Sequence, residues 1–263
     1  MRDHIKTLEI LITIGVVTAS LAVDLSGQRR GATSVSGPKT TSAPRPKEVG
    51  ATAVVVDETL SVLRSKPSLF AEPVQRMRRG RKVKILGVAE ADGVRFYKVS
   101  APPSNFGWVQ ADAVFGSFRP ADEGRLARLV QASDGFDQIE MAIEFFNLYP
   151  SSQFRPVMLL LFGDRLEEVA AKLSKDSLSR LTSREMAASG APAHSYFLNF
   201  VSLDRYRKIG IIFLFNPATR AFHYDGQSWK EIISKFPASA EAAEAQKRLD
   251  SLRVKMEAAP VAK

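Results

Sequence analysis

The sequence predicts an α+β protein with more than one domain, in which a small β-barrel is followed by an all-α region of helical hairpins. Short β-branched and aromatic runs, separated by turn residues, fill residues 50–118. Apolar residues at helical spacing fill residues 122–255. Residues 1–49 differ from both, because an apolar run is followed there by a basic stretch rich in Gly, Ser, Thr and Pro.

The chain therefore divides into five segments. They are a signal peptide or N-terminal membrane anchor at 1–25, a disordered basic linker at 26–49, the barrel at 50–118, the helical region at 122–255 and a disordered tail at 256–263. The linker is expected to be disordered because it lacks the large apolar side chains whose burial would offset the entropy lost on ordering.

Composition narrows the classes of function. With 263 residues, 45% of them hydrophobic, the chain can bury one good core or two small ones. Its formal charge of +9 is concentrated in residues 27–118, and such a basic surface suits nucleic acid, lipid headgroups or acidic cell-wall polymers. The absence of cysteine excludes disulfides, thiolate zinc sites and a lipidated cysteine.

The first 25 residues have the features of an export signal. Arg2 and Lys6 precede an apolar run at 10–23, which is shorter than the ~20 residues of a spanning helix. Ser20 and Ala22 fit the −3 and −1 positions of a cleavage site. A cleaved signal peptide is favoured, while an uncleaved inner-membrane anchor or a buried helix stays open. With either of the first two, the rest of the chain is extracytoplasmic, in the periplasm or secreted.

The barrel segment alternates apolar strands with turns. We expect strands at 53–56, 60–64, 83–88, 94–99, 106–110 and 113–115, with Pro67 and Pro73 bounding an irregular loop. Asp92-Gly93 is the signal of a two-residue hairpin. Alternation then places Tyr97 on one face of its strand, and Phe96 and Lys98 on the other.

Six short motifs follow one another in this segment. They are Leu60-Ser61-Val62-Leu63-Arg64, Lys66-Pro67-Ser68, Arg79-Gly80, Val83-Lys84-Ile85-Leu86-Gly87, Phe96-Tyr97-Lys98-Val99 and Gly107-Trp108-Val109. In this order they resemble the bacterial SH3-like (SH3b) domain, although Leu63 before Arg64, and Phe96 where tryptophan is common, depart from the pattern. The resemblance implies a non-catalytic binding or targeting module of an envelope protein, close to peptidoglycan or its enzymes.

Two sets of residues in the barrel are candidates for binding. Aromatic rings near loops can stack on a sugar or a peptide, and the candidate ligand-binding residues are Arg64, Tyr97, Phe106 and Trp108. Phe96 and Trp108 could instead cap the barrel core. The densest run of charge is the candidate contact for an anionic partner, with a solvated hairpin face as the alternative; it comprises Arg76, Arg78, Arg79, Arg81, Lys82 and Lys84. Nucleic acid is not expected as a partner, because the leader places these charges outside the cytoplasm.

The helical region contains an internal repeat. Asp122 can cap its first helix, which Asp134-Gly135 ends. A glutamate, an aromatic-Pro pair and a serine recur at the same spacing 87 residues apart, within 144–152 and within 231–239. In each copy the proline can end one helix and the serine can cap the next. This pattern resembles tetratricopeptide-type repeats of envelope assembly proteins, whereas generic helix hairpins remain an alternative.

Residues 203–224 are ambiguous between helix and strand. The spacing of Leu203, Tyr206, Gly210 and Phe213 favours a helix over 203–215. The continuous β-branched and aromatic run at 209–215 also fits a β-hairpin that turns at 216–219. Trp229, which follows on an apolar helical face, is expected in the core.

No catalytic pattern emerges. The three histidines form no metal-binding pair, and neither a Gly-x-Ser-x-Gly elbow nor a glycine-rich phosphate loop is present. Ser36 and Lys39 match Ser-x-x-Lys only by chance, within the expected linker. We therefore expect no catalytic residue, no metal, no cofactor and no enzymatic activity.

The sequence predicts an exported adaptor of the bacterial cell envelope. Its barrel is expected to bind a cell-wall polymer or an envelope protein, its helical repeats a protein partner, and its N-terminal segment the membrane if it is uncleaved. One alternative is a structural scaffold in which the barrel docks on the helical region. A second is an accessory to a cell-wall hydrolase, or a hydrolase with an unrecognised site.

Overall fold

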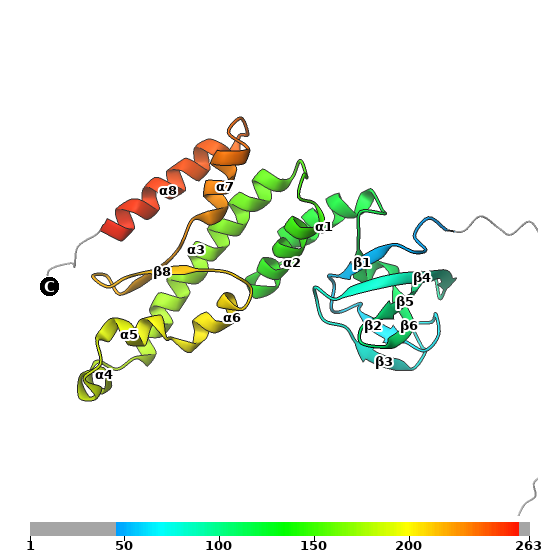
Figure 1. Cartoon of the computed structure of the whole chain (residues 1–263), viewed down its shortest axis with the longest axis horizontal. Coiled ribbons are helices and arrows are strands. Elements are labelled where there is room, and N and C mark those ends of the chain that lie inside the picture. Colours follow the sequence, from blue (N-terminus) through cyan, green and yellow to red (C-terminus); the bar gives the residue numbers. More distant parts are fainter. Residues whose placement is uncertain (1–45, 258–263) are drawn as a thin grey trace, which may run out of the picture. The chain divides into compact units, whose positions relative to one another are not determined.

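The computed structural model describes residues 46–257, which combine a curled antiparallel sheet with α-helices (Figure 1). The sheet comes first in the chain, and the helices follow with one β-hairpin among them. The predicted leader, most of the predicted linker and most of the predicted tail lie outside the described residues. At the boundaries, residues 46–49 form a turn, and the last helix continues to Glu257.

The sheet is built from short strands. They are β1 (Thr52–Val55), β2 (Val62–Arg64), β3 (Pro73–Arg76), β4 (Lys82–Ala91), β5 (Val94–Ala101), β6 (Asn105–Gln110) and β7 (Val114–Phe115), in the order β3-β2-β6-β5-β4-β1-β7. Strand β3 was not predicted, because it is a mostly exposed edge strand in which Val74 is the sole large aliphatic residue. Its Pro73 fits the first position of an edge strand, where no ladder hydrogen bond is lost.

The turn at Asp92-Gly93 joins β4 to β5 as predicted. Both residues have positive φ, 54° and 71°, which is the backbone of a type I′ turn. The carboxylate of Asp92 accepts hydrogen bonds from Ser68 Oγ at 2.7 Å and from Leu69 N–H at 2.8 Å. The turn therefore also holds the loop between β2 and β3.

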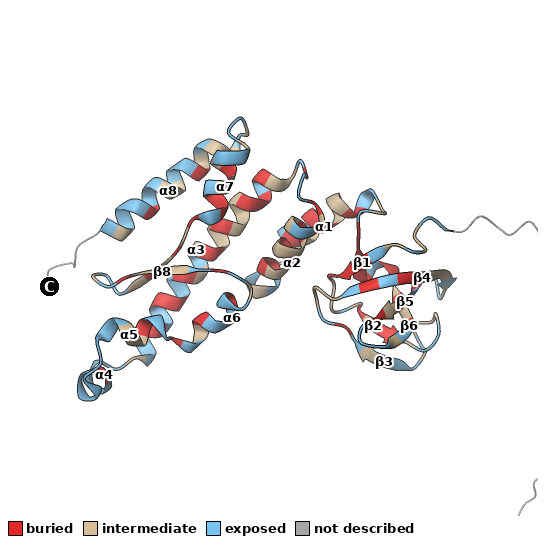
Figure 2. Ribbon diagram, viewed as in Figure 1, coloured by how far each residue is buried: buried red, intermediate tan, exposed pale blue. Residues whose placement is uncertain are grey.

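Alternate residues of the strands form the core of the sheet (Figure 2). Leu63, Ile85, Tyr97 and Val99 are fully buried there. Gly107 is required at its position, because a Cβ would lie 2.7 Å from the carbonyl oxygen of Arg64 and clash with Leu63. The close approach of β2 to β6 thus depends on this glycine.

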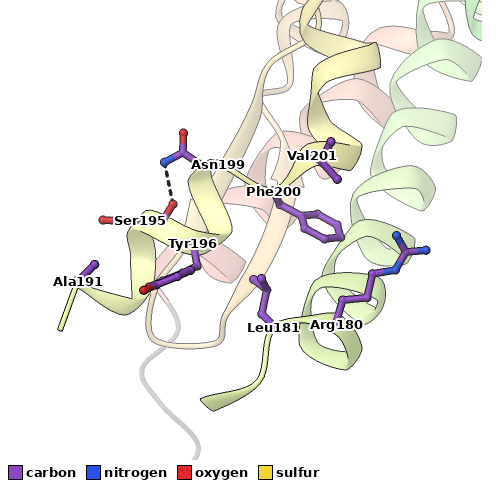
Figure 3. Close-up of a pocket in the computed structure, with 8 residues that line it drawn as sticks. All are labelled: Arg180, Leu181, Ala191, Ser195, Tyr196, Asn199, Phe200 and Val201. Atoms are coloured by element: carbon purple, nitrogen blue, oxygen red, sulfur yellow. Dashed lines mark hydrogen bonds between the residues drawn. The ribbon is translucent and has the colours of Figure 1, made fainter. Parts of the chain in front are cut away.

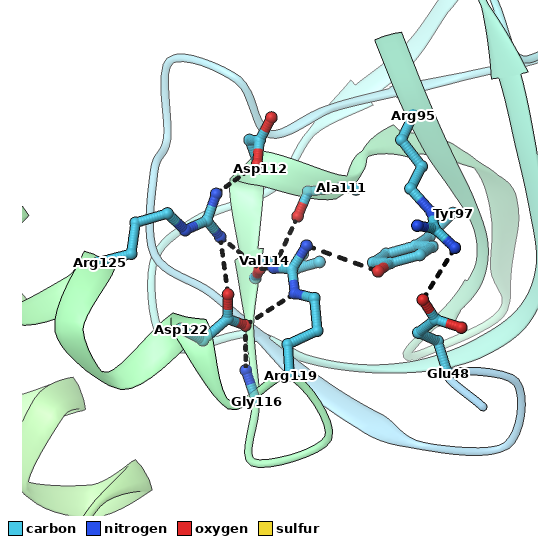
Figure 4. Close-up of polar contacts among 10 residues, drawn as sticks. All are labelled: Glu48, Arg95, Tyr97, Ala111, Asp112, Val114, Gly116, Arg119, Asp122 and Arg125. Carbon is cyan, nitrogen blue, oxygen red and sulfur yellow. Dashed lines mark hydrogen bonds and ion pairs between the residues drawn. The ribbon is translucent and has the colours of Figure 1, made fainter.

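The junction after the sheet is a network around one buried carboxylate (Figure 4). Helix α1 (Ala121–Ala132) starts after Pro120, so Asp122 lies in its first turn and the predicted capping role is wrong. Its carboxylate instead accepts hydrogen bonds from Gly116 N–H at 3.1 Å and Arg119 Nε at 2.9 Å, and it pairs with Arg125 at 3.2 Å. Burial raises the pKa of Asp122, and the two guanidinium groups oppose that rise.

Sheet and helices share a second apolar cluster. Val56 and Phe115 pack there with α1 and with α2 (Gly135–Leu148), which contributes Phe145. Beside this cluster the side chain of Arg79, only 7% exposed, donates to Val56 O at 2.9 Å. It also reaches α2 at Glu140 (2.8 Å) and at Asp137 (3.2 Å).

The remaining elements form the second half of the described chain. They are α3 (Arg155–Arg180), α4 (Ser183–Ser189), α5 (Ala193–Leu198), α6 (Asp204–Arg207), β8 (Phe213–Asn216), β9 (Ala221–Tyr224), α7 (Gln227–Lys235) and α8 (Glu241–Glu257), with a 3₁₀ turn at Val201–Leu203. Another 3₁₀ turn, at Ala111–Ala113, lies between β6 and β7. Trp229 is buried, as predicted, in the core that α3, α7 and the hairpin share.

The helix favoured over 203–215 is wrong, and the alternative, a hairpin, is confirmed. Gly210 has a φ of 81°, which ends the helical turn after α6. Beyond it the β-branched and aromatic run pairs as β8 with β9. The turn is closed by the Asn216 side chain, whose Oδ1 accepts from Ala218 N–H at 2.9 Å.

The two copies of the repeat adopt the same turn. Tyr149 N–H donates to Phe145 O at 2.9 Å, and 87 residues later Phe236 N–H donates to Ile232 O at 2.8 Å. The next backbone hydrogen bonds also correspond. Ser152 N–H donates to Tyr149 O in the first copy, and Ser239 N–H donates to Phe236 O in the second. The sequence repeat therefore corresponds to a repeated turn between two consecutive helices, α2 and α3 in the first copy and α7 and α8 in the second.

One edge of the β8–β9 hairpin is satisfied by side chains of α3. Ser174 Oγ accepts a hydrogen bond from Phe222 N–H at 2.7 Å, and Glu167 accepts one from Tyr224 N–H at 2.9 Å. Glu167 also lies 2.9 Å from His223 Nδ1 and 2.7 Å from Lys255 Nζ. Burial alone would raise the pKa of Glu167, but these hydrogen bonds outweigh it and lower the pKa to about 2.

We predict that Arg79→Ala lowers the free energy of unfolding by roughly 1–3 kcal/mol, because it leaves carboxylates of α2 without their cation. Urea unfolding measures the change. The matched control is Arg78→Ala, since the Arg78 side chain is exposed and has no polar partner among the described residues; this variant should stay within about 0.5 kcal/mol of the parent. Equal effects of the two variants would contradict the role of Arg79.

A second prediction concerns Glu167→Gln and pH. A carboxyl whose pKa falls on folding stabilises the native state above its unfolded pKa, and that stabilisation is lost as pH falls from about 4.5 towards 2. The variant should be less stable near neutral pH by roughly 1–3 kcal/mol. Melting temperatures measured from neutral pH to pH ~2 should converge with those of the parent; a constant difference across this range would refute the prediction.

Candidate functional site

The sheet carries two cross-strand rows of side chains on the side opposite its core. Arg64 of β2 lies directly opposite Trp108 of β6, and Trp108 lies opposite Lys98 of β5. In the next row Phe106 of β6 lies opposite Ser100 of β5, and Ser100 opposite Lys84 of β4. We call these six residues the barrel face, after the barrel expected for this segment, although the structure shows a curled sheet with β3 and β7 at its ends. They are Arg64, Lys84, Lys98, Ser100, Phe106 and Trp108.

The orientation of the barrel face follows from burial of the neighbours. Gly107 and Val109 are buried, so the alternate residues of β6, Phe106 and Trp108, point to the other side of the sheet. On β5, Tyr97 and Val99 are buried in the core, so Lys98 between them points to the side opposite the core. Directly opposite residues of antiparallel strands have Cβ atoms about 4.5–5.5 Å apart, so each row is continuous.

Exposure and charge make the barrel face suitable for an anionic ligand with a flat ring. The Phe106 side chain is 60% exposed, Trp108 is half-buried, and Lys84 and Lys98 are exposed. Arg64 is held in place, because its Nη1 donates to Ala71 O at 2.7 Å. Stacking on the rings and pairing with the cations are therefore available on one surface.

Tyr97, the fourth predicted ligand-binding residue, is not part of this face. Its side chain is fully buried in the core of the sheet, and its hydroxyl lies 3.5 Å from Arg119 Nη1. Phe96 points to the same side as Lys98 but is fully buried. The exposed aromatic surface of the face is that of Phe106 and Trp108.

The basic run at 76–84 is not one patch. Arg76 Nη1 donates to Glu58 O and Thr59 O, Arg81 Nη1 donates to Pro102 O, and Arg79 is buried against α2. Arg78, Lys82 and Lys84 are exposed, and their side chains have no hydrogen bond or ion pair to another described residue.

Two of these three cations have contrasting surroundings. Burial raises the pKa of Glu144 on α2, and the charges of Arg79 and Lys82 oppose that rise, which places Lys82 close to the helices. Lys84 is the member of the run that belongs to the barrel face.

Lys98 and Ser100 were not predicted as site residues. The alternation of buried and exposed residues along 94–101 already set Lys98 apart from the core. Its position beside Trp108 depends on the register of β5 with β6, which a single sequence does not provide.

The described residues offer other features that bear on chemistry. No group of three His, Asp or Glu side chains within 46–257 is placed to hold a metal ion. A cavity of about 560 Å³ opens between the end of α3 and α5 (Figure 3), with Leu181, Tyr196 and Phe200 among its lining residues. Its polar groups include Ser195 and Asn199, whose Nδ2 donates to Ser195 O at 2.9 Å. His194 is not among the lining residues of this cavity.

Comparisons of this chain with protein-family models, with curated proteins and with solved structures find no match. Among the helices of residues 46–257, none has the length and hydrophobicity needed to span a bilayer.

The two tryptophans give a direct check of the barrel face. Trp108 is half-buried and Trp229 is 2% exposed, so acrylamide should quench Trp108 several times more strongly. Trp229→Phe leaves Trp108 as the sole indole, and Trp108→Phe leaves Trp229. Similar Stern–Volmer slopes for the two variants would show that Trp108 is not accessible.

Proposed function

We propose that this chain is a non-catalytic, exported binding protein of the bacterial cell envelope, whose barrel binds an anionic glycan polymer of the cell wall. The observation that carries the proposal is the row of Arg64, Trp108 and Lys98, which places a ring between two cations. Resemblance of the barrel motifs to the SH3b domain, and of residues 1–25 to an export signal, supports the same setting.

A wall polymer fits the chemistry of the barrel face. Sugar rings have apolar faces that stack on Trp108 and Phe106, and carboxylates or phosphates along the polymer pair with Lys84 and Lys98. Such contacts are individually weak, because exposed ion pairs contribute little and are screened by salt. A polymer compensates by presenting many copies of the same unit.

The test is cosedimentation of the full chain with purified cell-wall sacculi at low and at physiological salt. The parent chain should pellet at low salt. Trp108→Ala should weaken binding at least about fivefold, as expected from the loss of ~1 kcal/mol, and Lys84→Glu with Lys98→Glu should weaken it further and reduce its salt dependence.

Two variants outside the barrel face provide matched controls. Val254→Ala removes exposed apolar surface from α8, and Lys172→Glu reverses an exposed charge on α3. Both should bind sacculi like the parent. If the parent stays in the supernatant at low salt, the wall-binding proposal is wrong.

A second proposed function, a scaffold in which the barrel is structural, is favoured by the contacts of Arg79 and by the shared cluster of Val56 and Phe115 with the helices. Limited chymotrypsin digestion separates the two. In a scaffold Phe118 is protected from cleavage, because its ring packs against the core of the sheet and meets Tyr97 edge-on with centroids 6.2 Å apart. Rapid release of a stable barrel fragment would count against the scaffold.

A further inference from the structure

The two edges of the β8–β9 hairpin differ. Phe222 and Tyr224 direct their N–H groups away from β8, to Ser174 and Glu167 of α3. In an antiparallel ladder, a residue whose N–H points away from its partner strand occupies a non-hydrogen-bonded pair. The residues opposite them, Phe215 and Phe213, therefore direct their own N–H and C=O groups outwards, to the other side of β8.

Those outward groups of β8 have no partner among residues 46–257. The small sheet consists of β8 and β9 alone, and neither the N–H nor the C=O of Phe213 or Phe215 has a further hydrogen bond to a described residue. Ile212, just before the strand, is 60% exposed, and Phe213, Leu214 and Phe215 are half-buried. An apolar strand edge of this kind is a template for pairing with another strand.

Packing holds β8 in an extended conformation. The Phe215 ring stacks on Phe197 of α5 with centroids 4.8 Å apart, and the Phe213 ring meets Tyr206 of α6 edge-on at 5.4 Å. The strand is thus anchored through its side chains while its outer backbone is left free. Such preorganisation lowers the entropic cost of binding an additional strand.

The surroundings of β8 indicate the chemistry of its partner. Lys208 precedes the strand and Arg220 follows it; both are exposed, and neither side chain has a hydrogen bond or ion pair to another described residue. A cavity of about 400 Å³ lies at the start of the strand, with Ile211, Ile212 and Phe146 in its lining. A complementary segment is therefore extended and apolar in its middle, with carboxylates on both sides.

We infer that the free edge of β8 binds an extended apolar segment of a partner protein, flanked by acidic residues, which adds a third strand to the β8–β9 sheet. Backbone hydrogen bonds from Phe213 and Phe215 provide the pairing, and Lys208 and Arg220 favour acidic flanks. This surface is independent of the barrel face and of any wall polymer bound there.

The test is titration of the isotopically labelled full chain, followed by amide NMR, with the peptide acetyl-Asp-Glu-Val-Thr-Val-Thr-Val-Glu-Asp-amide up to about 1 mM. Amide shifts should be concentrated at residues 211–216. The same peptide N-methylated at every Val and Thr cannot donate backbone hydrogen bonds from its five central residues and should not bind. A version with Lys in place of each Asp and Glu should bind more weakly.

Two variants of Phe213 separate the contribution of its backbone N–H from that of its ring. Phe213→Ala and Phe213→Pro both lose the ring, but only the proline removes the outward N–H, which an edge strand tolerates structurally. Phe213→Pro should bind roughly fivefold or more weakly than Phe213→Ala. If the proline variant melts at a lower temperature than the alanine variant, Lys208→Glu with Arg220→Glu provides the test without any change in the strand, and it should also weaken binding.

Three outcomes would overturn the inference. They are the absence of shifts at 1 mM peptide, which corresponds to a dissociation constant well above ~1 mM; equal binding of the N-methylated peptide; and concentration-dependent shifts at 213–215 without peptide. The last would assign the β8 edge to a second copy of this chain.

Discussion

The buried carboxylate of Asp122 joins the sheet to everything that follows it. It holds two guanidinium groups, and these in turn satisfy carbonyl oxygens at the end of the sheet, including that of Val114. A carboxylate taken out of water is costly unless it is paired and hydrogen-bonded, and here Arg119, Arg125 and the N–H of Gly116 meet that requirement. The start of α1 is therefore fixed relative to β7, and α1 and α2 can bury Val56 and Phe115 beneath them.

Local patterns predicted much of this architecture. Asp92-Gly93 specified a turn because both residues tolerate positive φ, and the aromatic-Pro pairs at 149–150 and 236–237 specified helix ends. The strand β3 and the hairpin at 213–224 were harder. Val74 alone gives β3 no alternation, and the apolar run at 209–215 fits a buried helix as well as a strand, so only its pairing with β9 decides.

The candidate site was predicted less completely than the fold. Trp108, Phe106 and Arg64 were recognised as chemically suitable, but Lys98 was missed because its value as a site residue comes from a register between strands. Tyr97 was included because an aromatic ring near a loop is a good ligand contact, whereas the pleat of β5 turns this ring into the core. Pairing between strands is a long-range property, so the composition of a strand does not reveal which side chains meet.

The pairing of Arg79 with α2 also changes what a charged partner meets. Six basic residues within nine positions suggest a strong local field, yet Arg79 is neutralised by Asp137 and Glu140, and Arg76 and Arg81 lie against backbone carbonyls. The three cations of the barrel face come from three different strands and are spread across the sheet. Long-range attraction between the protein and an anionic polymer should thus be modest. Once the two have met, the lifetime of the complex should depend on contact of the polymer with the rings of Phe106 and Trp108.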